Sequence, residues 1–185
     1  QLEAAVASYR RALEIDPGMV VAHYNLGMDL KSLGRIEEAL ASYRRTLELY
    51  PGYAEAHNNL GLALQALGKL DDAVACFRRA LEIKPSMLDA QSNLGLVQQE
   101  LGRHEEALAS YRRALEIKPD FAEVHCNLGL VLHALGHLED AAASYRRALE
   151  IKPDFAEAHC NLGITLQDLG QLDGAAASYR HALEI

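Results

Sequence analysis

The chain has 185 residues, of which 50% are hydrophobic and 24% are charged, and its formal net charge is −8. This length suits one ordinary domain or one short array of repeats. The sequence has no run of about 18 apolar residues that could cross a membrane, and its acidic balance is opposite to the basic stripe that nucleic-acid-binding proteins usually carry.

A repeat of 34 residues runs through the whole chain. The prolines that mark it are Pro17, Pro51, Pro85, Pro119 and Pro153. The glycines that follow a leucine are Gly27, Gly61, Gly95, Gly129 and Gly163, and a second glycine series is Gly34, Gly68, Gly102, Gly136 and Gly170. Self-similarity at a fixed period of this size predicts a solenoid of short helical units.

The predicted elements alternate between two kinds of helix. A second helix over residues 1–17 comes first, without a first helix before it. Five helix pairs follow at 20–53, 54–87, 88–121, 122–155 and 156–185, the last without its closing proline. We interpret 1–185 as a single all-α array. Because it begins in mid-repeat and ends without a polar capping helix, we expect it to be a stretch of a longer array.

The fourth pair illustrates how the helices are delimited. Its first helix is predicted over Ala122–Leu135 and its second over Glu139–Ile151, since apolar residues recur there at three- and four-residue spacing. Gly136 should end the first helix in a left-handed conformation. Asp120 with Glu123, like Asp154 with Glu157, resembles a capping box. A glycine inside each first helix costs about 1 kcal/mol relative to alanine, which predicts the close approach of a neighbouring backbone.

These residues resemble the tetratricopeptide repeat signature: leucine-glycine in the first helix, alanine followed four residues later by an aromatic in the second, and a closing proline. The resemblance covers the whole chain. It implies a right-handed superhelical α-solenoid of 34-residue helix-turn-helix repeats, with first helices on the concave face, that binds a protein or peptide. The usual tryptophan place holds His23, His57, Gln91, His125 and His159.

Every first helix also carries an asparagine two residues before its glycine. We call Asn25, Asn59, Asn93, Asn127 and Asn161 the asparagine ladder. Asparagine is a mediocre helix former, but its amide can pair with any peptide unit. Helices about 8–10 Å apart would place one asparagine at about every third residue of an extended ligand. The alternative is that these asparagines only bond neighbouring helices.

Selectivity is expected from the positions six residues beyond the ladder. These positions hold Gln65, Gln99, His133 and Gln167. The fourth and fifth repeats differ mainly around this part of the first helix, which favours a role in recognition. The first helices carry seven acids and the single lysine Lys31, so we predict an extended ligand that is neutral or basic.

The sequence contains no recognisable catalytic, cofactor or metal motif, so we predict a protein that is not an enzyme, with no cofactor and no metal. The repeated histidines lie one helix pair apart, which is too far for shared coordination. Arginine pairs such as Arg44–Arg45 are followed by a glutamate at helical contact spacing and indicate a solvated surface. Three cysteines without secretory features predict reduced thiols in the cytoplasm.

Three functional interpretations remain open. The first is an interaction scaffold that grips an extended peptide through the ladder. The second follows from phrases such as KPDFAEAHCNLG, which resemble the repeat arm of O-linked N-acetylglucosamine transferases and imply a substrate-recruiting arm of a larger glycosyltransferase. The third is a structural module that self-associates end to end through its uncapped termini.

Overall fold

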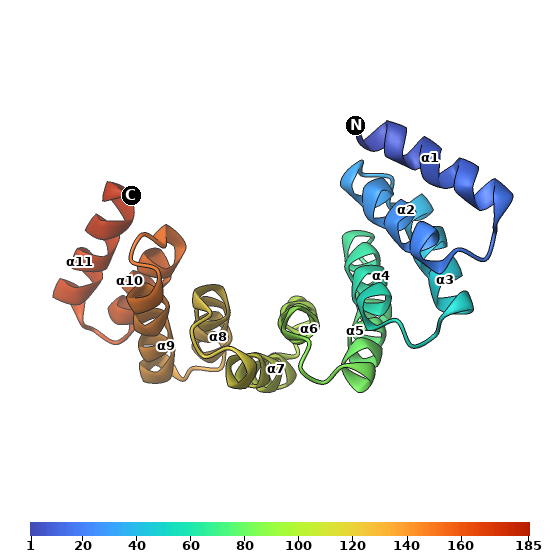
Figure 1. Cartoon of the computed structure of the whole chain (residues 1–185). Helices are drawn as coiled ribbons and strands as arrows, with labels where there is room; N and C mark the ends of the chain where they lie inside the picture. Colours follow the sequence, from blue (N-terminus) through green and yellow to red (C-terminus); the bar gives the residue numbers. More distant parts are fainter. The chain divides into compact units, whose positions relative to one another are not determined.

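The computed structural model describes all residues from 1 to 185, as eleven helices joined by short turns (Figure 1). The first helices are α2 (Val20–Ser32), α4 (Ala54–Ala66), α6 (Leu88–Glu100), α8 (Ala122–Ala134) and α10 (Ala156–Asp168). The second helices are α1 (Leu2–Ile15), α3 (Ile36–Leu49), α5 (Leu70–Ile83), α7 (His104–Ile117), α9 (Leu138–Ile151) and α11 (Leu172–Glu184). The predicted all-α fold of paired helix-turn-helix repeats is confirmed.

The helices form two compact units, Gln1–Val97 and Gln98–Ile185, and the boundary falls within α6. In the first unit α2 packs against α1 and α3, and α4 packs against α3 and α5. In the second unit α8 packs against α7 and α9, and α10 packs against α9 and α11. Neighbouring first helices also contact each other, α2 with α4 and α8 with α10.

Each first helix ends at a glycine in the left-handed conformation. At Gly136 the φ angle is +79°, and the other four glycines of this series have φ between +71° and +75°. The Gly136 amide donates to the His133 carbonyl, and the His137 amide donates to the Leu132 carbonyl, both at 2.9 Å. This pair of bonds satisfies the last carbonyls of the helix, as predicted, and glycine adopts the required φ without steric cost.

In α2, α4, α8 and α10 the interior glycine faces an aromatic ring of the second helix of its own pair. A Cβ atom added at Gly129 would lie 2.6 Å from Cε1 of Tyr145, and one added at Gly61 would lie 2.7 Å from Cε1 of Phe77. The predicted close approach is therefore present, but the neighbour is a fully buried ring and not a backbone. An alanine would force that ring to move in a close-packed interior.

The predicted capping boxes are wrong. The N-cap of α8 is Phe121 and that of α10 is Phe155, and neither helix has a side-chain cap. The aspartate therefore stands one residue too early to reach the first-turn amides. Asp120 instead accepts a hydrogen bond from Arg147 Nη2, while the Val124 and His125 amides both donate to the Phe121 carbonyl at 3.1 Å.

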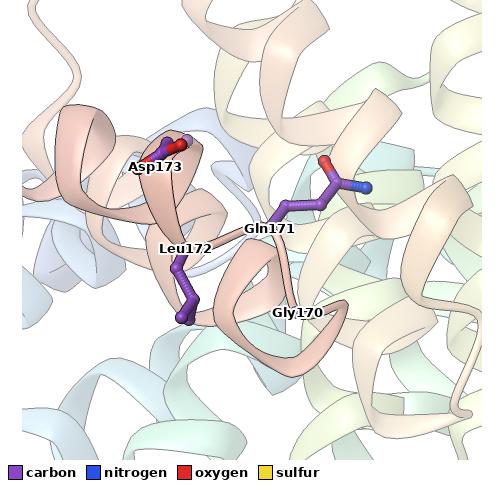
Figure 2. Close-up of a pocket in the computed structure, with 5 residues that line it drawn as sticks. Gly170, Gln171, Leu172 and Asp173 are labelled. Carbon is purple, nitrogen blue, oxygen red and sulfur yellow. The ribbon is translucent and has the colours of Figure 1, made fainter.

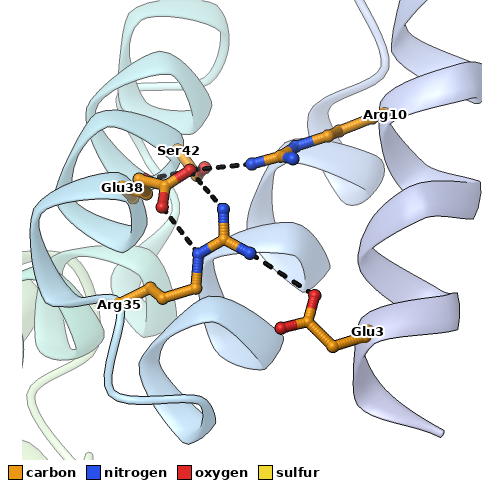
Figure 3. A network of polar contacts seen from close by, with 5 residues as sticks. All are labelled: Glu3, Arg10, Arg35, Glu38 and Ser42. Carbon is orange, nitrogen blue, oxygen red and sulfur yellow. Dashed lines mark hydrogen bonds and ion pairs between the residues drawn. The ribbon is translucent and has the colours of Figure 1, made fainter.

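An exposed ion-pair network ties α1 to the start of α3 (Figure 3). Arg35 Nε and Nη2 donate to the two carboxylate oxygens of Glu38 at 2.6 and 2.8 Å, and Arg10 Nη2 donates to Glu38 Oε2 at 2.7 Å. Arg35 Nη1 also lies 3.4 Å from Glu3 Oε2. The hydrogen bond from Arg35 is the largest cause that lowers the pKa of the Glu38 carboxyl, and Arg10 lowers it further. Because the groups are solvated, the network contributes little to stability at moderate salt.

The second helices carry the predicted solvated ion pairs. Arg45 Nη1 lies 2.8 Å from Glu48 Oε2, and Arg147 Nη1 lies 2.8 Å from Glu150 Oε2, both three residues apart on one helix. All four side chains are exposed. Such pairs add a few tenths of a kcal/mol each.

Candidate functional site

The asparagines of the ladder are half-buried, and three of them bond to the preceding first helix. Asn59 Nδ2 donates to Tyr24 Oη at 2.9 Å, and Asn93 Nδ2 donates to Asn58 Oδ1 at 3.0 Å. Asn161 Nδ2 makes a longer contact, 3.9 Å, with Cys126 Sγ. Each acceptor is the residue immediately before the ladder position in the preceding repeat. Bonding between neighbouring helices, the alternative raised by the sequence, is therefore present.

These bonds fix which end of the asparagine amide faces the neighbouring helix. In Asn59, Asn93 and Asn161 the amide nitrogen is directed to the neighbouring helix. No group of the chain donates to the Oδ1 atoms of these three side chains, so each keeps a carbonyl acceptor. An acceptor of this kind matches the N–H of a peptide unit. The structural bond and a ligand contact can thus use opposite ends of one amide.

The predicted selectivity positions have the opposite polarity. Gln99 Oε1 accepts from Tyr111 Oη at 3.1 Å, and Gln167 Oε1 accepts from Tyr179 Oη at 3.2 Å. Both glutamines are thereby held with the amide nitrogen as their remaining donor group. His133 Nε2 lies 2.8 Å from Asp168 Oδ2, which joins the fourth and fifth repeats. The remaining member of this row, Gln65, is half-buried on α4.

An apolar row that the sequence reasoning missed lies between these two sets. Three residues beyond the ladder each first helix has a large apolar residue that is exposed or half-buried. The row consists of Met28, Leu62, Leu96, Leu130 and Ile164. The sequence could have indicated this row. Its residues lie on a different side of the helix from the leucine that precedes each interior glycine and packs in the core.

The acidic residues of the first helices are partly neutralised. Lys84 Nζ donates to Glu55 Oε1 at 2.9 Å, and Lys152 Nζ lies 3.8 Å from Glu123 Oε1. The hydrogen bond from Lys84 lowers the pKa of Glu55. The negative charge of the first helices is thus smaller than their own residues indicated, because lysines of the turns that end the same helix pairs compensate part of it.

Four of the repeated histidines have a structural partner. Their Nε2 atoms lie 2.8 to 3.1 Å from the carbonyl oxygen of the proline six residues earlier. The four are His23, His57, His125 and His159. Each bond fixes the start of a first helix to the turn before it. This supports the packing role that the spacing predicted, and no group of three His, Cys, Asp or Glu side chains is arranged to hold a metal ion.

A shallow hollow of about 490 Å³ lies at the turn between α10 and α11 (Figure 2). Its lining is Gly170, Gln171, Leu172, Asp173 and Gly174. The lining contains no member of the ladder and only one titratable side chain, so the hollow offers no set of groups for acid–base or nucleophilic chemistry. The ladder remains the candidate site. None of the helices is both long and apolar enough to traverse a lipid bilayer.

Comparison with known proteins agrees with the geometry. The chain is 24% identical to MamA over 86% of its own length and 93% of that chain, with a TM-score of 0.82. It is 22% identical to MamA from Desulfovibrio magneticus RS-1 over 89% of its own length and 93% of that chain, with a TM-score of 0.84. It is 26% identical to YrrB, described as a TPR protein with an unusual peptide-binding site. That match covers 95% of this chain and 91% of YrrB, with a TM-score of 0.81. The curated proteins gave no significant sequence match.

Family models locate the repeat in the sequence itself. Models of the tetratricopeptide repeat match residues 1–19, 24–87 and 156–185, and a model described as TPR repeat matches 99–136 and 129–170. Together they leave only 20–23 and 88–98 unmatched. The chain therefore belongs to the tetratricopeptide repeat family.

Proposed function

We propose that the chain binds an extended segment of another protein along its first helices, with the asparagine ladder gripping the peptide backbone. Tetratricopeptide repeats mediate protein–protein interactions, and the description of YrrB records a peptide-binding site in that protein. The observation that carries the proposal is the orientation of the ladder amides. In Asn59, Asn93 and Asn161 the amide nitrogen bonds the neighbouring helix, and the carbonyl oxygen is left as an acceptor.

The packing of each unit favours this surface. In each unit the backbones of neighbouring first helices approach each other, α2 with α4 and α8 with α10, whereas the backbones of α3 and α5, or of α9 and α11, do not. Each stack is consequently tighter on the side of the first helices, which is the inner side of a bend. An extended ligand placed there meets side chains of successive repeats at short intervals.

The rows on this surface fit a peptide in an extended conformation. The selectivity positions lie six residues from the ladder, which corresponds to about 9 Å along the helix. Hydrogen-bonded strands are about 4.8 Å apart, so a peptide backbone fits between two such rows. Its N–H groups would face the asparagine oxygens, and its carbonyls would face the nitrogens of Gln99 and Gln167. The apolar row beneath, including Leu96 and Ile164, would contact side chains.

The test uses a peptide selected from a displayed library of random nonapeptides on the unmodified chain. Two double variants each remove two ladder asparagines from one unit: Asn59→Ala with Asn93→Ala, and Asn127→Ala with Asn161→Ala. Two lost hydrogen bonds at about 1 kcal/mol each predict affinity about thirtyfold weaker in the variant whose unit holds the peptide. Fluorescence anisotropy of the labelled peptide measures it.

The matched control is Arg44→Ala with Glu48→Ala, on the exposed side of α3, and it should leave the affinity unchanged. Circular dichroism establishes that every variant keeps its helix content. Affinities within twofold of the unmodified chain for both ladder variants would contradict the proposal.

A second candidate is the substrate-recruiting arm of a larger glycosyltransferase. The observation in its favour is the asparagine-leucine-glycine triplet in every first helix, from Asn25 to Gly163. MamA and YrrB, the similar structures named above, are not described as transferase arms, so the first candidate is preferred. Sequencing the reading frame beyond residue 185 decides the matter, since a catalytic domain either follows or is absent.

A further inference from the structure

We propose that Tyr24, Tyr50 and Tyr53 form a docking site for an arginine side chain of the bound peptide. We call these three residues the tyrosine cluster. The inference deepens the proposed function and rests on it, because the cluster would select one side chain of a peptide that the ladder holds by its backbone.

The cluster extends from the ladder to the surface of the first unit. The ring centroids of Tyr24 and Tyr53 are 4.7 Å apart with the planes tilted by 33°, and those of Tyr53 and Tyr50 are 5.9 Å apart. Tyr24 Oη accepts the hydrogen bond from Asn59, so one end of the cluster touches a ladder position. At the other end Tyr50 is 55% exposed. Beneath them the buried ring of Tyr43 lies 6.1 Å from that of Tyr24.

The equivalent positions of the later repeats show which chemistry belongs there. In the turn before α8 Lys118 Nζ lies 4.8 Å from the ring centroid of Phe121, and in the turn before α10 Lys152 Nζ lies 4.8 Å from that of Phe155. Tyr53 aligns with these phenylalanines, and Tyr50 aligns with these lysines. The turn before α4 therefore has the ring but lacks the cation that the turns before α8 and α10 supply.

The charge around the cluster favours a cation from outside. Burial is the main cause that raises the pKa of Tyr53, and the negative charge of Glu55 raises it further. Glu55 Oε1 accepts a hydrogen bond from Lys84 Nζ at 2.9 Å, so this carboxylate beside the cluster already attracts a cation. An arginine can stack its planar guanidinium on a tyrosine face while donating to a carboxylate, whereas the lysine head is a compact point charge. A phosphate or carboxylate would be repelled by Glu55.

The experiment compares nonapeptides selected by three forms of the chain from one displayed library. The first is the unmodified chain, and the second is Tyr50→Lys, which would place a cation over Tyr53 as Lys118 is placed over Phe121. The third, Tyr50→Phe, keeps the ring. We expect arginine to be enriched at one peptide position by the unmodified chain and by Tyr50→Phe, and the enrichment to disappear with Tyr50→Lys.

An affinity measurement then isolates the guanidinium charge. Replacing that arginine by citrulline in the best peptide should weaken its binding to the unmodified chain about tenfold, and to Tyr50→Lys less than about twofold. Enrichment of proline, an apolar residue or an acid in place of arginine overturns the inference, and so does an arginine preference that Tyr50→Lys leaves intact.

The two proposals fail in different ways. Peptides that need Asn59 and Asn93 but carry no preferred arginine overturn the docking site and leave the ladder standing. Peptides whose binding is unaffected by all the ladder substitutions overturn the proposed function. A library from which the unmodified chain selects nothing overturns both.

Discussion

The third and fourth repeats share one plan but fill its interior differently. In the fourth, His125 Nε2 lies 2.8 Å from the Pro119 carbonyl oxygen, and Leu132 is buried. In the third, Gln91 stands in place of the histidine and Gln98 in place of the leucine, and both are buried. Leu132 needs no polar partner, whereas each glutamine brings an amide that must find one.

The two glutamines meet this requirement unequally. Gln98 Oε1 accepts from Ser110 Oγ at 2.7 Å, and its Nε2 donates to Glu106 Oε2 at 3.1 Å. Gln91 Nε2 is buried without a partner. Ser92 Oγ and His104 Nδ1 are also buried without one, so three of the four such side-chain atoms in the chain lie between residues 91 and 104. Buried polar side chains in this repeat are thus hydrogen-bonded only where nearby residues supply a partner. The third repeat holds most of the buried polar atoms that lack one.

The largest effect is expected from placing a buried glutamine in the fourth repeat, at the position where Leu132 now packs. Leu132→Gln should lower the free energy of unfolding by about 3 kcal/mol, because it removes apolar burial and buries an amide. The equivalent of Ser110 in the fourth repeat is Ser144, which already donates to the Asp140 carbonyl at 2.9 Å. Urea unfolding followed by circular dichroism measures the loss.

Its matched control is the reverse exchange in the third repeat, Gln98→Leu with Ser110→Ala. Replacing both partners of a buried hydrogen bond by apolar groups is close to neutral or stabilising. A loss of less than about 1 kcal/mol for Leu132→Gln would contradict the expected cost of an unpartnered amide.

A smaller effect is expected from exchanging the residues at the histidine position. Gln91→His should raise the stability by about 1 kcal/mol, because the imidazole can bond the Pro85 carbonyl as its equivalents bond theirs. His125→Gln should lower the stability by a similar amount. Thermal unfolding of the two single variants and of the double exchange measures this. If the Gln91→His chain were no more stable than the unmodified one, the turn at Pro85 would differ in geometry from the turns at Pro17, Pro51, Pro119 and Pro153.

Much of the fold followed from the spacing of a few residues. The left-handed Gly136 and the acidic first turn of α7 were predictable, because each depends on chemistry within a few positions of the chain. Contacts between repeats were not. The partner of Gly129 is a ring 16 residues away, and the bond of Asn59 reaches Tyr24, 35 residues away. The sequence assigned the asparagines to the first helices, but only these longer contacts show which end of the Asn59, Asn93 and Asn161 amides bonds the neighbouring helix.

The smallest effect concerns the position just before the ladder, which holds Cys126 in the fourth repeat and Ser92 in the third. Burial raises the pKa of the Cys126 thiol to about 11, and its sulfur faces the Asn161 amide.

At pH 8 about 0.1% of that thiol is ionised, and only the thiolate reacts, so iodoacetamide should label the exposed Cys160 first. Labelling of Cys126 should rise about tenfold per pH unit below pH 11, since the thiolate fraction does. A thiol introduced by Ser92→Cys should react faster than Cys126, because buried groups without partners make the third repeat easier to open. Mass spectrometry of labelled peptides compares the three rates. Equal rates at the Ser92→Cys thiol and Cys126 would mean that the third repeat opens no more readily than the fourth, and that its unsatisfied groups carry no dynamic consequence.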